Sequence, residues 1–169
     1  LCALADSRLG ITLCDHSIER RSKLSETLGS LVDKLTIKNI RLNNLRKAKK
    51  KSRNKIDIVQ AQRKDLIEEM NEFLAQALKG KVKLKDEKVK LYKQAGEKRK
   101  VSGTLGALVD GLSQTNVQLW HLEDEARKSD VNDAYIGRIK RKIDIANQIR
   151  NDLIDRIDEL LERKIKKWR

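Results

Sequence analysis

Leucine recurs along two stretches of the chain in steps of three, four and seven residues. This spacing places the leucines on one side of a helix and leaves polar residues on the other side. Each stretch is therefore predicted to form an amphipathic helix. The first stripe consists of Leu24, Leu28, Leu31, Leu35, Leu42 and Leu45, and the second of Leu105, Leu108, Leu112, Leu119 and Leu122.

A second apolar seam follows each leucine stripe after a short polar turn. "SRN" at 52–54 and "SDVND" at 129–133 separate the paired segments, and Asn54 and Asp133 are the expected N-caps of the helices that follow. The chain is thus predicted to form two helical hairpins. The seams consist of Ile56, Val59, Leu66, Met70, Phe73 and Ala77, and of Ile136, Ile139, Ile143, Ala146, Leu153, Ile157 and Leu160.

The two hairpins are copies of one another. "TLGSLVDKL" at 27–35 recurs as "TLGALVDGL" at 104–112. An offset of 77 residues keeps 12 of 27 positions identical from residue 26 onward. An offset of 87 residues keeps 10 of 20 positions identical from residue 55 onward, so the second copy contains ten additional residues between its two halves.

These patterns predict an all-α fold: an elongated four-helix bundle built from two tandem repeated helical hairpins. We expect a single domain over residues 1–169, in which the repeats 26–78 and 103–165 are joined by a basic linker, 79–102. The linker begins with "KVKLK", which alternates like a strand. We expect a helix there, because its apolar residues also fit one helical face and no partner strand is evident.

The composition agrees with long helices. Proline is absent, only 8 glycines occur, charged residues make up 38% of the chain and aromatic residues 3%, as in helix bundles and coiled coils. No apolar run approaches the length of a membrane span, and we expect a cytoplasmic protein. Export is the alternative, because "LCALADS" at the start resembles the end of a signal peptide.

Several polar residues recur at equivalent positions of the apolar seams. Asn39 matches Asn116, and Arg63 matches Arg150. We expect Arg150, Asp152 and Asn116 to form one polar layer, and the first copy to form a second. Such layers either fix the helix register or form a pseudo-two-fold anion pocket, and exposure at the surface is the third alternative. Aspartates recur in the same way at Asp33 and Asp110, Asp57 and Asp144, and Asp65 and Asp152.

The sequence contains few patterns that are typical of catalytic or metal-binding sites. His121 and Glu125 lie four residues apart on a helix, a spacing that can offer two ligands to a metal. The first copy has neither a histidine nor an acid at these positions, so we expect no metal site and no cofactor. Neither a glycine-rich phosphate loop nor a nucleophile motif in a strand–turn context is present, which favours a non-enzymatic role.

The net charge of +14 suggests a polyanionic partner. Lysine and arginine concentrate in "RKAKKKSRNK" at 46–55 and in the linker. Stacking aromatics are scarce, so contacts with RNA would be made to phosphates and would depend strongly on salt. The candidate polyanion contacts are Lys47, Lys49, Lys50, Lys51, Arg53, Lys81, Lys83 and Lys85.

Over about residues 104–161 the sequence resembles an uncharacterised bacterial family of small helical proteins, encoded in part near glycosyltransferase and cell-envelope genes. The resemblance implies a bacterial helical protein of unknown role, and the first copy departs from the motif at Asn43 and Asn44. The matching residues are Trp120, His121, Glu123, Asp124, Asn147, Gln148, Arg150, Asn151 and Asp152.

Our leading hypothesis is a non-enzymatic helical-bundle protein that docks on an acidic partner or larger assembly through its basic ends. The alternative is a non-specific RNA- or ribosome-binding protein. A second alternative is an enzyme or accessory factor of cell-envelope glycans that uses the region of Arg150 and Asp152. Oligomers are compatible with each hypothesis.

Overall fold

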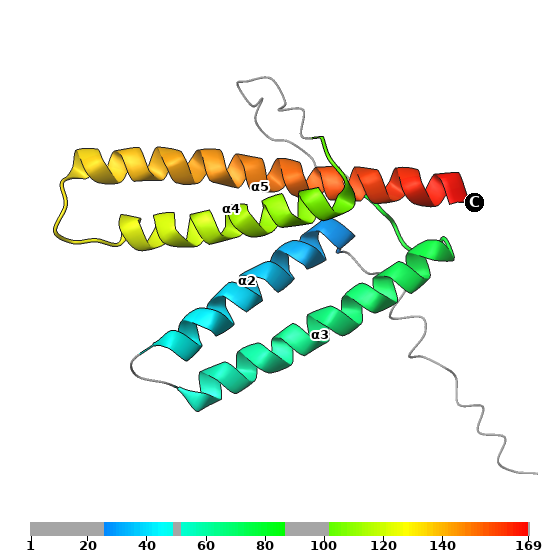
Figure 1. Cartoon of the computed structure of the whole chain (residues 1–169), viewed down its shortest axis with the longest axis horizontal. Coiled ribbons are helices and arrows are strands. Elements are labelled where there is room, and N and C mark those ends of the chain that lie inside the picture. Colours follow the sequence, from blue (N-terminus) through cyan, green and yellow to red (C-terminus); the bar gives the residue numbers. More distant parts are fainter. Residues whose placement is uncertain (1–25, 49–51, 87–101, 169) are drawn as a thin grey trace, which may run out of the picture.

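The computed structural model describes residues 26–48, 52–86 and 102–168. These residues form four α-helices and no strand, which confirms the predicted all-α four-helix fold (Figure 1). The helices are α2 (Leu28–Lys47), α3 (Arg53–Leu78), α4 (Leu105–Ala126) and α5 (Asp133–Trp168).

The helices pair as two antiparallel hairpins, α2 with α3 and α4 with α5 (Figure 1). Helix α2 also packs against both α4 and α5, whereas α3 packs mainly on α2. The hairpins meet near the starts of α2 and α4 and diverge toward the opposite end (Figure 1). Helix α2 therefore makes most of the helix contacts between the two hairpins.

The hydrophobic core lies where the two hairpins meet. Leu31, Phe73, Leu112 and Ile157, one from each helix, are completely buried there. Because every helix contributes to this cluster, burial of apolar surface holds the two hairpins together. The other buried members are Leu28, Val32, Ala77, Leu108, Leu153, Ile154 and Ile165.

The predicted apolar seams supply eight of the eleven buried residues of this core, whereas Val32, Ile154 and Ile165 were not predicted. Leu105 is 39% exposed because it lies at the first position of α4, beyond the packed region. Asn39 is exposed, whereas its counterpart Asn116 is buried. Leu24 lies outside the described residues. No helix within the described ranges has both the length and the apolar character needed to cross a membrane.

Corresponding threonines cap the first helix of each hairpin. The side-chain oxygen of Thr27 accepts a hydrogen bond from the backbone N–H of Ser30 at 3.3 Å, and Thr104 accepts one from that of Ala107 at 3.3 Å. Each cap satisfies a backbone donor that has no partner within its helix. The repeated "TLG" therefore marks a helix start in both hairpins.

The caps predicted for the second helices were each wrong by one or two residues. Ser52, not Asn54, is the N-cap of α3. Asn132 caps α5, because its Oδ1 accepts a hydrogen bond from the backbone N–H of Tyr135 at 2.8 Å. Asp133 instead lies in the first turn of α5, where a negative charge is favoured by the helix dipole.

The ten additional residues of the second copy lengthen α5. Helix α3 contains 26 residues and α5 contains 36. The offset of 87 aligns the start of α3 with residue 140, so the first two turns of α5 have no counterpart in the first hairpin.

The helix predicted for the linker is wrong at residues 81–86, which form no regular element. Gly80, with φ of 73°, follows the end of α3. Val82 and Leu84 then pack against the core. Residues two apart lie on the same side of an extended chain but on different sides of a helix, so this burial favours the extended form. The remainder of the linker, 87–101, lies outside the described residues.

Candidate functional site

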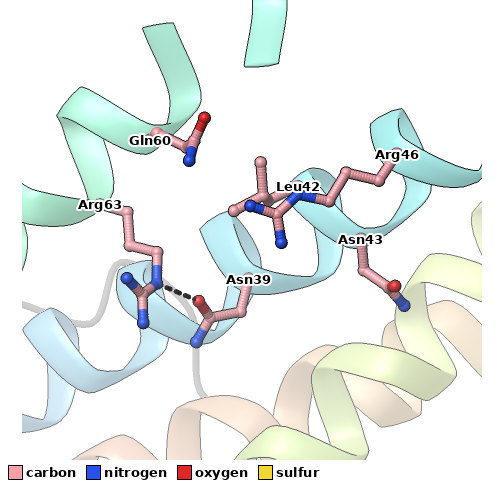
Figure 2. A pocket seen from close by; sticks show the side chains of 6 residues that line it. All are labelled: Asn39, Leu42, Asn43, Arg46, Gln60 and Arg63. Atoms are coloured by element: carbon pink, nitrogen blue, oxygen red, sulfur yellow. Dashed lines mark hydrogen bonds between the residues drawn. The ribbon is translucent and has the colours of Figure 1, made fainter. Parts of the chain in front are cut away.

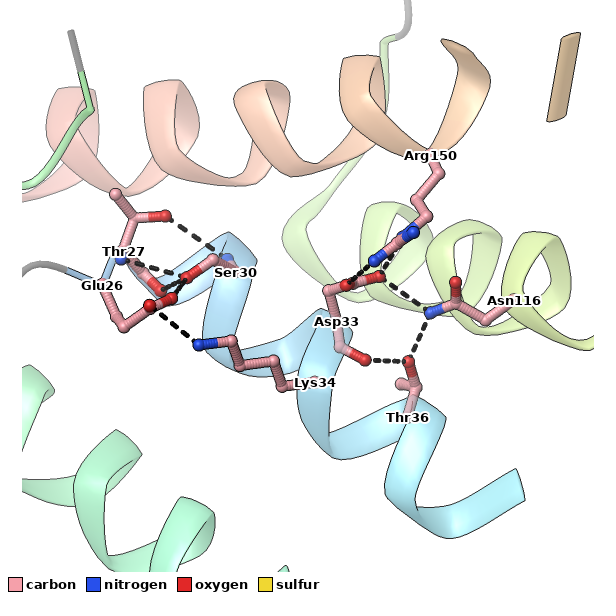
Figure 3. Close-up of polar contacts among 8 residues, drawn as sticks. All are labelled: Glu26, Thr27, Ser30, Asp33, Lys34, Thr36, Asn116 and Arg150. Carbon is pink, nitrogen blue, oxygen red and sulfur yellow. Dashed lines mark hydrogen bonds and ion pairs between the residues drawn. The ribbon is translucent and has the colours of Figure 1, made fainter. Parts of the chain in front are cut away.

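A buried ion pair joins the two hairpins. Asp33 of α2 is 3% exposed and faces α5 at the point where the hairpins meet. The Nε of Arg150 donates a hydrogen bond to one carboxylate oxygen of Asp33 at 2.7 Å, and an amino group of Arg150 donates to the other oxygen (Figure 3). This two-pronged geometry is the strong form of a charge-assisted hydrogen bond.

Asn116 of α4 completes the cluster. Its Nδ2 donates to Asp33 at 3.0 Å and to the hydroxyl of Thr36 at 2.6 Å (Figure 3). The Thr36 hydroxyl donates in turn to the backbone carbonyl of Asp33 at 2.8 Å. The hydrogen bond with Asp33 raises the pKa of Arg150 above its usual value, so the guanidinium stays charged. Three helices are thereby fixed around one carboxylate.

The predicted partner of Arg150 was wrong. Arg150 pairs with Asp33 of the other hairpin, whereas Asp152 accepts a hydrogen bond from Gln148 at 3.5 Å. Residues two apart on a helix point in different directions, so Arg150 and Asp152 do not face the same neighbour. The sequence contained one signal for Asp33 as a contact residue, because both copies have a glycine four residues before this aspartate, at Gly29 in the first copy. This spacing places a small residue and an acid on one helix face.

Gly29 forms the second contact between α2 and α5. Its backbone N–H donates to the carboxylate of Asp158 at 2.7 Å, and Asp158 is 3% exposed. A Cβ at Gly29 would lie 2.5 Å from the backbone oxygen of Ile154. Only glycine allows the helices to approach this closely. The first hairpin is thus docked by a glycine and an aspartate one turn apart.

An open pocket of about 360 Å³ lies beside Arg150 but is not suited to an anion. Glu26, Asp33 and Asp86 place three carboxylates on its walls, against the cations of Lys34 and Arg150. The best donors of Arg150 are already used by Asp33. The hydrogen bonds of the cluster form a lock between helices, and the pocket beside it is lined by more carboxylates than cations.

The corresponding residues of the first hairpin form a different environment. The Nε of Arg63 donates to the Oδ1 of Asn39 at 2.7 Å (Figure 2). Both line an open pocket of about 370 Å³ between α2 and α3, together with Arg46 and Gln60. None of the described residues that line this pocket carries a carboxylate. The five predicted seam residues thus do not share one site: Asn116 and Arg150 meet, Asn39 and Arg63 meet elsewhere, and Asp152 stands apart.

The predicted polyanion contacts lie at two ends of the molecule. Lys47 and Arg53 are exposed where α2 finishes and α3 begins, and Lys81 and Lys83 are exposed after α3. Lys85 differs, because it forms an ion pair with Glu159 at 3.4 Å. The remaining three, Lys49, Lys50 and Lys51, lie outside the described residues.

The acid at the end of α4 is engaged in local contacts. Glu125 accepts hydrogen bonds from the hydroxyl of Tyr135 at 2.7 Å and from Lys128 at 2.8 Å. The Lys128 contact, and then the Tyr135 contact, hold the pKa of Glu125 below its usual value, and Glu125 raises the pKa of Tyr135. His121 is exposed. Among the described residues, no three potential metal-binding side chains gather at one point.

One part of the chain matches a known family. Residues 106–169 match the family described as "Protein of unknown function (DUF4254)". This confirms the expected resemblance to an uncharacterised family over part of the chain, although the match covers less than half of it. No curated protein and no solved structure matches this chain.

The DUF4254 segment includes nearly all of α4 and the whole of α5. It therefore contains Asn116 and Arg150 of the buried cluster. Asp33, which both residues contact, comes from the first hairpin and lies outside the matched segment. The carboxylate that completes the lock is thus supplied by the part of the chain that the family model does not cover.

Proposed function

We propose that this protein is a non-enzymatic interaction protein that docks on an acidic partner or assembly through its basic ends. The proposal is carried by four exposed cations where α2 finishes and α3 begins: Arg46, Lys47, Arg53 and Lys55. None of the four forms an ion pair with another described residue. We call these four residues the basic end.

The helix dipole explains the positions of only two of the four cations of the basic end. Arg46 and Lys47 lie in the last turn of α2, where cations are favoured by the helix dipole. Arg53 and Lys55 lie at the start of α3, where the dipole is positive and cations are disfavoured. No acid occurs in that turn and no side chain caps it. These two cations therefore oppose folding, which supports a role toward an external anion.

In the second hairpin, the cations that follow α4 are paired internally. Arg127 forms ion pairs with Glu123 at 3.5 Å and Asp124 at 2.9 Å, and Lys128 pairs with Glu125 at 2.8 Å. Arg46 and Lys47, at the end of α2, have no such partners among the described residues. This asymmetry supports docking through one defined end over a general solubilising role of the positive charge.

Reversal of the basic end provides the test. The variant carries Arg46→Glu, Lys47→Glu, Arg53→Glu and Lys55→Glu. The control reverses four other exposed cations that form no ion pair with any described residue: Lys140, Arg141, Lys142 and Lys164. Both variants change the net charge equally. A loss of binding in the first variant alone would therefore show that the location of the cations matters and not the total charge.

Each protein is immobilised and incubated with lysate, with and without nuclease, and retained material is identified by mass spectrometry. We expect acidic proteins that survive nuclease treatment to bind the wild type and the control but not the basic-end variant. Loss of all retained material after nuclease treatment would instead support the RNA-binding alternative. Equal retention by both variants would overturn docking through this end.

A further inference from the structure

The glycine and the aspartate that lie four residues apart at the start of α2 recur at the start of α4. The two copies of this motif differ in burial. In α2, Gly29 and Asp33 lie against α5, and both are buried. Their counterparts in α4, Gly106 and Asp110, are exposed. No atom of the described residues lies within 4 Å of a Cβ built at Gly106. Asp110 accepts one hydrogen bond, from the neighbouring Gln114 at 2.8 Å. The motif that docks the first hairpin is thus exposed at the surface of the second hairpin.

The surface that receives the motif is also duplicated. On α5 it consists of Arg150, Ile154 and Asp158, with Asn116 beside it. The same offsets place Arg63, Ile67 and Asn71 on α3, with Asn39 beside them. Asn71 and Asn39 are exposed, and Arg63 and Ile67 are half-buried. We call these four residues of the first hairpin the acceptor face.

The acceptor face has the chemistry that an aspartate requires. Arg63 forms no ion pair with any described residue. Its Nε donates to the side-chain Oδ1 of Asn39, whereas the Nε of Arg150 donates to the carboxylate of Asp33. Neutral oxygen thus occupies the place of a carboxylate oxygen (Figure 2). Asn71 replaces Asp158, and its amide oxygen can likewise accept a backbone N–H.

We propose that the Gly106–Asp110 face of one molecule docks on the acceptor face of a second molecule of this chain. Asp110 then pairs with Arg63, and Gly106 allows α4 to approach α3 as closely as Gly29 allows α2 to approach α5. The partly exposed Leu105 and Val117 of α4 add apolar surface to the contact. This inference is independent of the basic end.

The geometry selects a second molecule as the occupant. An exact two-fold relation between the hairpins would place the α4 motif on α3 of the same molecule. The structure lacks that relation, because α2 packs on α5 while α3 has no comparable interface with α4. The α4 motif of one molecule therefore docks on α3 of the next molecule. Such a heterologous contact forms rings or open chains, not an isologous dimer.

Sedimentation velocity over a range of protein concentrations tests the proposal. We expect reversible association of the wild type, weakened about tenfold or more by Asp110→Arg and by Arg63→Asp. Combining the two substitutions restores an ion pair of reversed polarity and should recover most of the association. Asp144→Arg and Arg141→Asp, at exposed positions of α5, are the matched controls and should associate like the wild type.

Gly106→Ala separates docking from folding. Its Cβ meets no atom in the described part of the same molecule, and alanine favours a helix more than glycine, so the melting temperature should be unchanged or higher. In the docked arrangement the same Cβ would collide with a helix backbone, and association should weaken about tenfold or more. A wild type that remains monomeric at every soluble concentration would overturn the proposal. Association that Gly106→Ala and Asp110→Arg leave unchanged would also overturn it.

Discussion

Arg150→Ala tests whether the buried cluster holds the two hairpins together. The substitution removes the guanidinium and leaves the carboxylate of Asp33 with a single side-chain hydrogen bond among the described residues, from Asn116. The side chain of Asp33 is 5% exposed, so water replaces the lost donors poorly. A buried charge that loses its partner typically costs about 3–5 kcal/mol.

The structure places the expected loss near the lower limit of that range, at about 3 kcal/mol. The Arg150 side chain is 29% exposed, so its removal opens a path by which water can partly solvate the carboxylate. Small domains unfold with a free energy of about 5–15 kcal/mol, so this loss would be a large fraction of the total. Removing the charge as well, with Asp33→Asn, should recover part of it.

The repeat supplies a matched control. Arg63→Ala removes the equivalent arginine, which bonds a neutral and exposed amide, and should cost less than about 1 kcal/mol. Urea denaturation followed by circular dichroism gives the free energies of unfolding of the wild type and both variants. Equal losses in Arg150→Ala and Arg63→Ala would refute the idea that the buried cluster is specific. A normally stable Arg150→Ala would refute its structural role altogether.

Three further perturbations test the packing and the electrostatics. Gly29→Ala should destabilise the fold by about 1–3 kcal/mol in urea denaturation, because its Cβ would lie 2.5 Å from the backbone of Ile154; wild-type stability would contradict the close approach. Phe73→Ala should cost about 3–5 kcal/mol in the same assay, because the ring is completely buried in the core, and a loss below 1 kcal/mol would contradict that burial. Hydrogen bonds from Lys34, and then from Ser30, hold the pKa of Glu26 below its ordinary value of 4.5. Its contribution to stability is therefore complete above pH 4.5 and is lost as the pH falls through the lowered pKa. The melting temperature of Glu26→Gln should accordingly fall less on acidification than that of the wild type, and parallel curves would exclude this contribution.

The sequence by itself determined the local structure and the apolar faces. The positions of the four helices, the two hairpins and most core residues follow from periodicity, because the backbone conformation and the direction of each side chain depend on near neighbours. Threonine before each "LG" acts as a cap for the same reason. Where a local signal was ambiguous, as at Ser52 and Asn54, the error was one or two residues.

Only the tertiary structure decided which member of each duplicated pair is buried. Asp33 and Asp110 stand in nearly identical sequences, yet one is enclosed by three helices and the other is exposed. Asn116 and Asn39 differ in the same way. The angle at which the hairpins meet depends on the packing of side chains from all four helices, and periodicity within one helix contains no information about it. The partner of Arg150 is 117 residues away for this reason.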